Sequence, residues 1–277
     1  MIDSTFCLMM VMRIRKSYIL VLVCLLLGAC QAFDVHPYDG KIKGKKYLNK
    51  INIQRIEAAT QGARQIRFAV ISDTQRWLDE LRDEVKSINE HEDIDFVIHC
   101  GDLVDYGITK EFDWQQEVLL GLHAPFVVAL GNHDCLGSGK DVFRKMFGPE
   151  NYSFVAGHVR FVCVDTNALE YDFSNPVPDL SFLHTFVQKD DVEASVVVMH
   201  TKPYDDEFDN NVAEPFHSYI KQMPNPLFCL CGHSHKSAAF DLFNDGLIYY
   251  QANCGKNREY YIFTVTGQTY TYETIRY

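Results

Sequence analysis

Five apolar segments of the chain each end at residues that can bind a metal ion or transfer a proton. The residues that follow these segments are Asp73, Gly101-Asp102, Gly131-Asn132-His133-Asp134, His200 and Gly232-His233-Ser234-His235. Because ligands of parallel α/β sheets gather beyond the carboxyl ends of the strands, we expect these side chains at one edge of a sheet. The glycines let the chain turn sharply there. The sequence therefore predicts a site rich in carboxylate, amide and imidazole groups.

These donor types together predict a metal site. Carboxylate oxygen, amide oxygen and imidazole nitrogen suit divalent ions such as Mn, Fe, Co or Zn. The set is too large for one structural zinc ion, which takes about four ligands. It suits two adjacent ions that share a bridging carboxylate, and ion pairs about 3.5–4 Å apart are typical of displacement at phosphorus.

The ordered series of motifs resembles the calcineurin-like metallophosphoesterase superfamily. The family pattern places Asp-x-His, Gly-Asp-x-x-Asp, Gly-Asn-His-Asp/Glu, a lone His and Gly-His-x-His after successive strands. Between Ile66 and Lys236, this sequence has the same order in Gly101-Asp102-Leu103-Val104-Asp105, Gly131-Asn132-His133-Asp134, His200 and Gly232-His233-Ser234-His235. The resemblance implies a four-layer α/β sandwich of two packed mixed β-sheets flanked by helices, and an enzyme that hydrolyses a phosphate mono- or diester.

The resemblance also implies two divalent ions and a role for each matching residue. Asp102 would bridge the ions, Asp73, Gln75 and His235 would hold the first, and Asn132, His200 and His233 would hold the second. A hydroxide between the ions would attack phosphorus in line. His133 would act as the general acid, and Asp134 would hold the other ring nitrogen of His133 in the right tautomer.

Gln75 departs from the family pattern, which usually has histidine at this position. An amide oxygen is a weaker donor than imidazole for softer metals. We therefore expect a more oxygen-rich first site that favours Mn, with Mg, Fe or Zn as alternatives. The other interpretation is that Gln75 binds no metal and that the first site is weak or half-filled.

Alternating strands and helices must position this site. Apolar, β-rich segments predict strands over 66–72, 95–100, 125–130, 160–164, 195–199 and 227–231, and shorter ones near 238–243, 247–252, 259–265 and 269–275. Helical patterns lie over 77–91, 112–122, 181–188 and 214–222. Helices that alternate with strands early, and strands that pair locally late, predict one α/β domain with two sheets.

The first thirty residues resemble an export signal. Arg13, Arg15 and Lys16 precede an apolar run over 18–27 that is too short to span a bilayer. The run ends in Leu27-Gly28-Ala29-Cys30, which resembles a bacterial lipobox with Cys30 as the lipidated residue. The alternative is a plain signal peptide with an incidental cysteine. We expect a lipoprotein signal over 1–29, a lipidated tether and linker over 30–60, and the metallophosphoesterase domain over 61–277.

The composition limits the class of partner. The chain has 277 residues, of which 47% are hydrophobic and 23% charged, which is typical of a globular protein and excludes a disordered or fibrous one. Its net charge of −11 excludes a global basic field for nucleic acid. We expect a small phosphorylated substrate and a monomer anchored outside the cytoplasm of a bacterium by the lipid on Cys30. Two alternatives stay open: a non-catalytic binding module on the same fold, and an envelope-directed pyrophosphatase.

Overall fold

The structure is a computed structural model that describes Tyr18, 39–170, 176–189 and 191–277. Apart from Tyr18, the predicted signal peptide and the lipobox with Cys30 lie outside the described residues. Within the part of the chain that is described, no helix is both long and apolar enough to cross a membrane. Residues 39–277 belong to one compact unit.

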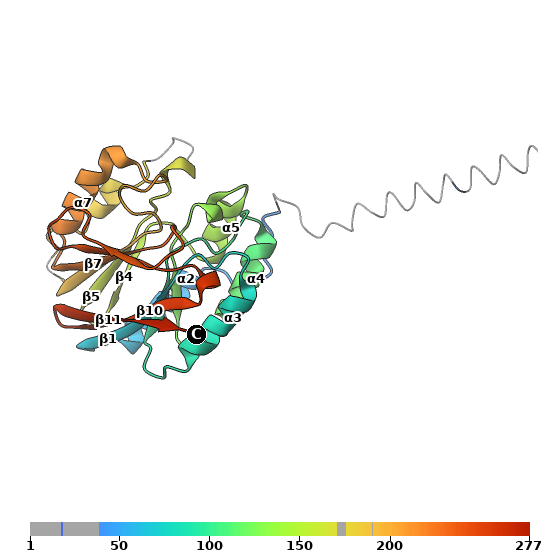
Figure 1. The fold of residues 1–277 in the computed structure, drawn as a ribbon, viewed down its shortest axis with the longest axis horizontal. Helices are drawn as coiled ribbons and strands as arrows, with labels where there is room; N and C mark the ends of the chain where they lie inside the picture. The colour runs from blue at the N-terminus through green and yellow to red at the C-terminus, as the bar shows by residue number, and fades with distance from the viewer. Residues whose placement is uncertain (1–17, 19–38, 171–175, 190) are drawn as a thin grey trace, which may run out of the picture. The chain divides into compact units, whose positions relative to one another are not determined.

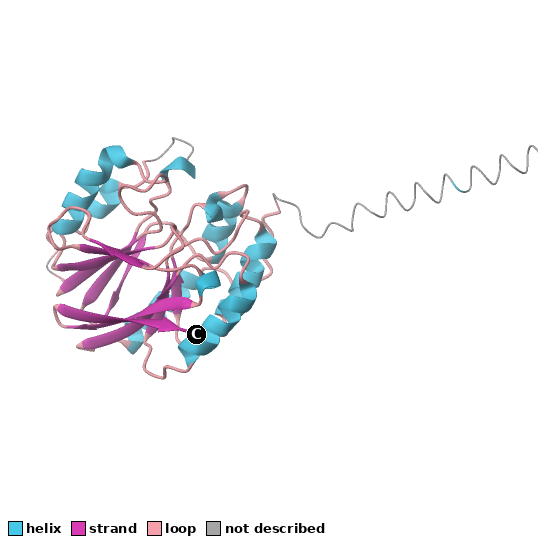
Figure 2. Cartoon of the chain, viewed as in Figure 1, coloured by secondary structure: helices cyan, strands magenta, loops and turns pink. Residues whose placement is uncertain are grey.

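Two mixed β-sheets form the centre of this unit (Figure 1, Figure 2). The first has the strand order β11-β10-β1-β2-β3, with β1 (Gln65–Ile71), β2 (Phe96–His99), β3 (Phe126–Val128), β10 (Glu259–Thr266) and β11 (Thr269–Arg276). The second has the order β4-β5-β6-β7-β9-β8, with β4 (Tyr152–Ala156), β5 (Val159–Cys163), β6 (Ala194–Val198), β7 (Pro226–Cys231), β8 (Ala238–Phe240) and β9 (Ile248–Gln251). Strands β1, β2 and β3 are parallel, and so are β5, β6, β7 and β9. The predicted fold class is confirmed.

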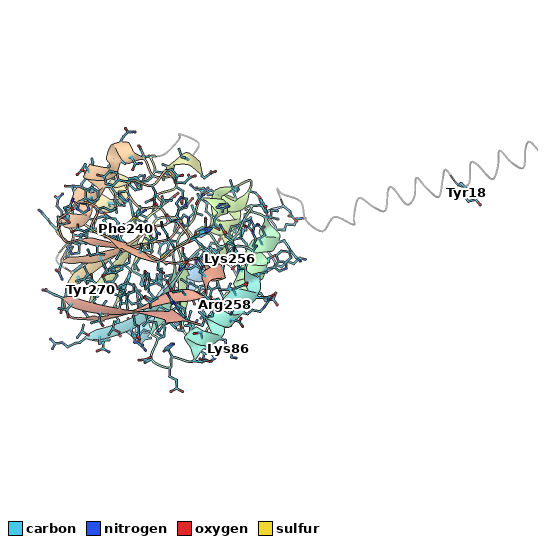
Figure 3. The ribbon with its side chains drawn as sticks, in the orientation of Figure 1. Tyr18, Lys86, Phe240, Lys256, Arg258 and Tyr270 are labelled. Atoms are coloured by element: carbon cyan, nitrogen blue, oxygen red, sulfur yellow. The ribbon has the colours of Figure 1, made fainter. Side chains whose placement is uncertain are left out.

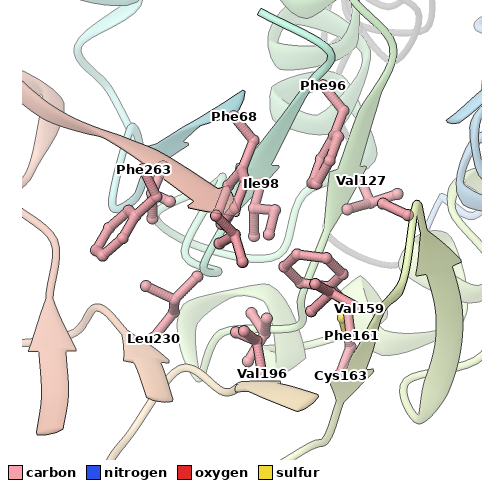
Figure 4. Packing of buried hydrophobic residues seen from close by; sticks show 14 of the residues in the cluster. Phe68, Phe96, Ile98, Val127, Val159, Phe161, Cys163, Val196, Leu230 and Phe263 are labelled. Carbon is pink, nitrogen blue, oxygen red and sulfur yellow. The ribbon is translucent and has the colours of Figure 1, made fainter. Parts of the chain in front are cut away.

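An aromatic core holds the two sheets face to face. Phe68 of β1 stacks on Phe96 of β2 with ring centroids 4.9 Å apart, and Phe161 of β5 meets Phe68 edge-on at 5.2 Å. Figure 4 shows these rings between the sheets with Val196 and Leu230, all of them fully buried. Because this core fixes one sheet against the other, loops from both sheets can build a single site.

Helices cover the outer faces of both sheets (Figure 2). On the first sheet lie α3 (Leu78–Asn89), α4 (Thr109–Leu119) and α5 (Gly139–Met146), and on the second lie α6 (Leu180–His184) and α7 (Ala213–Lys221). Single turns of 3-10 helix are η1 (His133–Cys135), η2 (Ala168–Glu170), η3 (Asn210–Val212) and η4 (Gly255–Asn257). Arg258, which follows η4, pairs with Asp83 of α3 at 2.8 Å and ties the C-terminal segment to that helix (Figure 3). Helix α5 and strand β4 are absent from the sequence-based prediction.

Helix α2 (Leu48–Ala59) closes the open edge of the first sheet. Asn49 Nδ2 donates to the Val128 carbonyl at 2.9 Å, and Asn49 Oδ1 accepts from the Val128 amide at 3.0 Å. Asn52 Nδ2 donates to the Phe126 carbonyl at 2.8 Å, and Ile56 is fully buried. These amides therefore occupy the edge of β3 that a further strand would otherwise pair with. The structure corrects the predicted tether and linker over 30–60, because residues 48–59 are part of the fold.

Candidate metal centre

The predicted site residues follow strands of both sheets. Asp73 and Gln75 follow β1, Asp102 follows β2, Asn132 follows β3, His200 follows β6, and His233 and His235 follow β7. A hydrogen bond crosses between the sheets here, since the His233 amide donates to Asp73 Oδ2 at 3.1 Å. The carboxyl ends of parallel strands from both sheets therefore meet at one edge, where the strand-end pattern places the site.

Two buried carboxylates lie at the centre of this edge. Asp102 Oδ2 lies 3.4 Å from His200 Nε2 and 3.3 Å from Gln75 Nε2. Asp73 Oδ1 lies 3.4 Å from His235 Nε2. Donor atoms of Asp73, Asp102 and His200 all lie within 4.8 Å of one another. One small cation placed among them can therefore reach all three side chains.

Asn132 links the remaining histidines to this centre. Its Oδ1 lies 3.0 Å from His200 Nε2 and 3.2 Å from His233 Nδ1. His200 Nδ1 contacts the Cys100 carbonyl at 2.8 Å, so Nδ1 carries the proton and Nε2 faces the site. Asp206 Oδ1 lies 3.3 Å from His233 Nε2 and turns the other ring nitrogen of His233 towards Asn132. All seven predicted metal ligands are thus joined by short contacts into one cluster.

The carboxylates of the cluster need positive charge. Asp73 is fully buried, and its Oδ1 accepts no hydrogen bond. Burial lowers the pKa of His200, but the charges of Asp102 and Asp73 outweigh burial and raise that pKa to about 10. The neighbouring Asp73 carboxylate raises the pKa of His235. Protons on these histidines compensate the carboxylates, and divalent cations can replace the protons because they bind the same lone pairs. The residues present therefore fit divalent metal ions.

The backbone at the site adopts conformations that are rare for residues other than glycine. Positive φ values between 37° and 74° occur at Asp73, Gln75, Asp102, His233 and His235. Each such residue costs about 1–2 kcal/mol, and such strain clusters at functional sites. Of the predicted turn glycines, Gly101 has a positive φ of 102°. Gly131 is required by close approach instead, because an added Cβ would lie 2.2 Å from Asp102 Oδ1.

His133 and Asp134 do not form the predicted pair. His133 Nδ1 lies 2.8 Å from the Asp105 carbonyl. Asp134 is fully buried, and its carboxylate accepts from the backbone amides of residues 102, 103, 104 and 131 at 2.9–3.1 Å. The structure therefore corrects the role of Asp134: it anchors the loop that carries Asp102, and the Asp105 carbonyl orients His133.

The sequence-based prediction also missed two polar residues that contact the loops of the site, one of them buried beneath the loops and one exposed beside them. Gln115 of α4 donates to the Gln75 carbonyl. The sequence pattern could have indicated Gln115, because this polar residue lies between Phe112 and Leu119 on the buried side of α4, where an apolar residue is expected. Arg76 pairs with Asp105 at 2.7 Å, but nothing in its sequence context indicated this contact.

Metal-dependent hydrolases of phosphoric esters are the class of protein that this fold and site define. The chain belongs to the calcineurin-like phosphoesterase family, whose sequence model matches residues 66–237. The family uses divalent metals, which agrees with the clustered donors of Asp73, Asp102 and His200.

Named proteins share sequence or fold with this chain. A probable cyclic nucleotide phosphodiesterase of Rhodopseudomonas palustris is 43% identical over 58 residues, which is 21% of this chain and only 20% of that protein. Among solved structures, a dimetal phosphatase from Danio rerio has a TM-score of 0.60 at 16% identity, over 76% of this chain and 99% of that one. A purple acid phosphatase from yellow lupin (Lupinus luteus) seeds has a TM-score of 0.59 at 15% identity, over 76% and 51% of the two chains. At these identities the two structures show a shared fold.

Proposed function

We propose that the protein hydrolyses a phosphate mono- or diester with two divalent ions held at this site. The main support is the Asp102 carboxylate, which lies between Gln75 and His200 among donors from both sheets. Asp102 would be shared, with Asp73, Gln75 and His235 on the first ion and Asn132, His200 and His233 on the second. When bound, such ions neutralise phosphate charge and lower the pKa of an attacking water.

His133 would supply the proton to the leaving oxygen. The Asp105 carbonyl can only accept a hydrogen bond, so His133 Nδ1 keeps its proton and Nε2 is the atom that exchanges one. The protonated ring can then donate from Nε2 while Nδ1 stays fixed. Asp134 contributes indirectly, because it anchors the loop that carries Asp102.

The substrate we expect carries little charge beyond the reacting phosphate. The loop after His200 adds negative charge near the site, since Asp206 lies 3.3 Å from His233 and Glu207 is next in sequence. These carboxylates repel polyphosphates more than diesters. The relative from Rhodopseudomonas palustris, named as a probable cyclic nucleotide phosphodiesterase, also supports a diester.

A matched substrate panel tests this proposal. The protein loaded with Mn²⁺, Mg²⁺ or Zn²⁺ is assayed on p-nitrophenyl phosphate, bis(p-nitrophenyl) phosphate and a nucleotide pyrophosphate. Turnover of the monoester or the diester supports the proposal. Turnover of the pyrophosphate alone would favour the pyrophosphatase. Full metal occupancy without turnover of any of them would favour a non-catalytic binding module.

Gln75 would make the first ion site prefer Mn²⁺ over Zn²⁺. We expect Gln75→His to raise Zn²⁺ affinity by roughly tenfold, or about 1.4 kcal/mol, because imidazole replaces an amide oxygen. Calorimetric titration with each metal measures the change. Gln222→His, at an exposed position, controls for adventitious binding by an added histidine. Equal Zn²⁺ affinity in the wild type and Gln75→His, or two Zn ions per wild-type chain purified without chelator, would contradict the preference.

We further propose that the protein is a lipoprotein anchored by Cys30 outside the cytoplasm of a bacterium. The support is the sequence of residues 13–30, with its basic start, apolar run and lipobox-like end. Fractionation of cells that express the full chain should recover it with membranes and should release Cys30→Ser. Recovery of both in the same fraction would contradict the anchor.

A further inference from the structure

A buried hydrogen-bond network lies behind the first ion site. It consists of Thr74, between two predicted ligands, His99 at the end of β2, and Gln115 on α4; we call it the His99 network. Thr74 and His99 are fully buried, and Gln115 is 1% exposed. His99 Nε2 lies 2.9 Å from Thr74 Oγ1, and the Thr74 hydroxyl donates to Gln115 Oε1 at 3.0 Å. None of the three is a predicted metal ligand.

Each hydrogen bond of the network has a fixed direction. The Gly101 amide donates to His99 Nδ1 at 3.2 Å, so the ring proton is on Nε2 and points to Thr74. The Thr74 hydroxyl then has its proton free for Gln115 Oε1, which leaves Gln115 Nε2 to donate to the Gln75 carbonyl. Burial lowers the pKa of His99 to about 4, although the charge of Asp73 acts to raise it. The ring is therefore neutral, as these hydrogen-bond directions require.

The two ends of the network lie on the two loops that carry the first site. One end is Gly101, directly before Asp102, and the other is the carbonyl of Gln75. The loops also pair directly, because the Asp73 amide donates to the Gly101 carbonyl at 3.0 Å and the Gln75 amide to the Asp102 carbonyl at 3.3 Å. Asp73, Gln75 and Asp102 have φ values of 51°, 37° and 58°, so this paired arrangement is strained and needs support from its surroundings.

We propose that Thr74, His99 and Gln115 are positioning residues that hold Asp73, Gln75 and Asp102 in the strained backbone arrangement needed to bind the first metal ion. This inference rests on the proposed metal centre and adds that part of the affinity for that ion comes from side chains that do not touch it. The second site shares Asp102, but its other ligands, Asn132, His200 and His233, make no hydrogen bond with the network. Loss of the network should therefore weaken binding of the first ion much more than binding of the second.

Removing the Thr74 hydroxyl interrupts the network at its middle. We expect Thr74→Val, which keeps the shape of the side chain, to lower Mn²⁺ affinity at one of two sites by roughly 10–100-fold, as is typical when a group behind a metal ligand is lost. Thr74→Ser, which keeps the hydroxyl, should restore most of that affinity. Calorimetric titration of each full-chain protein with Mn²⁺ alone gives the stoichiometry and both affinities without any assay of activity.

Thr60→Val is the matched control. Thr60 is 1% exposed and its hydroxyl also makes two hydrogen bonds, to the Ile56 carbonyl at 2.8 Å and from the Gly157 amide at 3.0 Å, but it lies outside the metal site at the end of α2. Both Mn²⁺ affinities should be retained in this variant, although its free energy of unfolding falls. If Thr74→Val does not fold, Gln115→Met interrupts the network from α4 with similar side-chain length.

The outcomes separate this inference from the proposed function. Two wild-type Mn²⁺ affinities that are unchanged in Thr74→Val and Gln115→Met would overturn the positioning role and leave the metal centre intact. An equal loss at both sites, or a loss shared by Thr60→Val, would indicate general destabilisation and would also overturn it. A wild type that binds no Mn²⁺ would overturn the metal centre itself, and the inference with it.

Discussion

Asp102→Asn is expected to abolish hydrolysis, with a loss of roughly 10³-fold or more in kcat, and to lower the metal content of the protein. The carboxylate is 1% exposed and has one oxygen 3.4 Å from His200, while the other accepts from the His133 amide at 2.9 Å. An amide has the same shape but no charge, so it cannot neutralise a shared cation. Loss of the charge stabilisation that a metal ion supplies costs several kcal/mol in the transition state. A cost of about 4 kcal/mol corresponds to a roughly 10³-fold loss in kcat.

Metal analysis and kcat measured on the same preparation test the role of Asp102. Asp165→Asn is a matched control, because Asp165 is also a buried carboxylate, 4% exposed, but pairs with Lys140 at 3.1 Å. We expect this control to lose stability and to keep its metal content. Wild-type activity in Asp102→Asn would show that a shared carboxylate is not needed, and would overturn the dinuclear assignment.

His133→Asn is expected to slow hydrolysis according to the leaving group. Turnover of an alkyl ester should fall by about 10²–10⁴-fold, because an alkoxide leaves poorly without a proton. Turnover of a p-nitrophenyl ester should fall much less, because p-nitrophenolate leaves without help. Metal content should not change, since the contact of residue 133 with Asp102 is made by its backbone amide.

The dependence of kcat on the pKa of the leaving group measures this effect. A series of esters should give a steeper dependence for His133→Asn than for the wild type. His158→Asn is the control, because the His158 ring lies near two backbone carbonyls, of Ala63 and Gly267, away from the predicted metal ligands. An unchanged rate on the alkyl ester, or an equal loss on every ester, would remove His133 from the role of general acid.

The fold and the position of the site were predictable because both depend on short-range patterns. Each of Asp73, Asp102 and His200 follows an apolar run within one or two residues, and a polar residue just after a strand lies at the edge of its sheet. The aromatic and β-branched residues of β1, β2 and β6 indicated buried strands for the same local reason. The predicted bounds therefore differ from the observed ones by only a few residues.

The role of Asp134 was not predictable from its position beside His133. Neighbours in sequence suggested that the carboxylate holds the ring. In the fold, that carboxylate accepts from the Gly131 amide and from the backbone amides of residues 102–104, and these last three come from a different strand–loop connection. Four donors satisfy the buried carboxylate better than one ring nitrogen can. The result depends on how two loops pack together, which no local pattern encodes.

Taken alone, the sequence determined which residues are candidates for the metal-binding set, where along the chain the strands precede them, and the departure at Gln75. Only the tertiary structure decided what supports that set: the Asn49 amide at the edge of β3, the Asp105 carbonyl on His133, and the His99 network. The physical reason is the range of the interactions. Ligand types and strand ends are local properties, whereas a buried polar group is satisfied by whichever donor or acceptor the packing of distant elements brings to it.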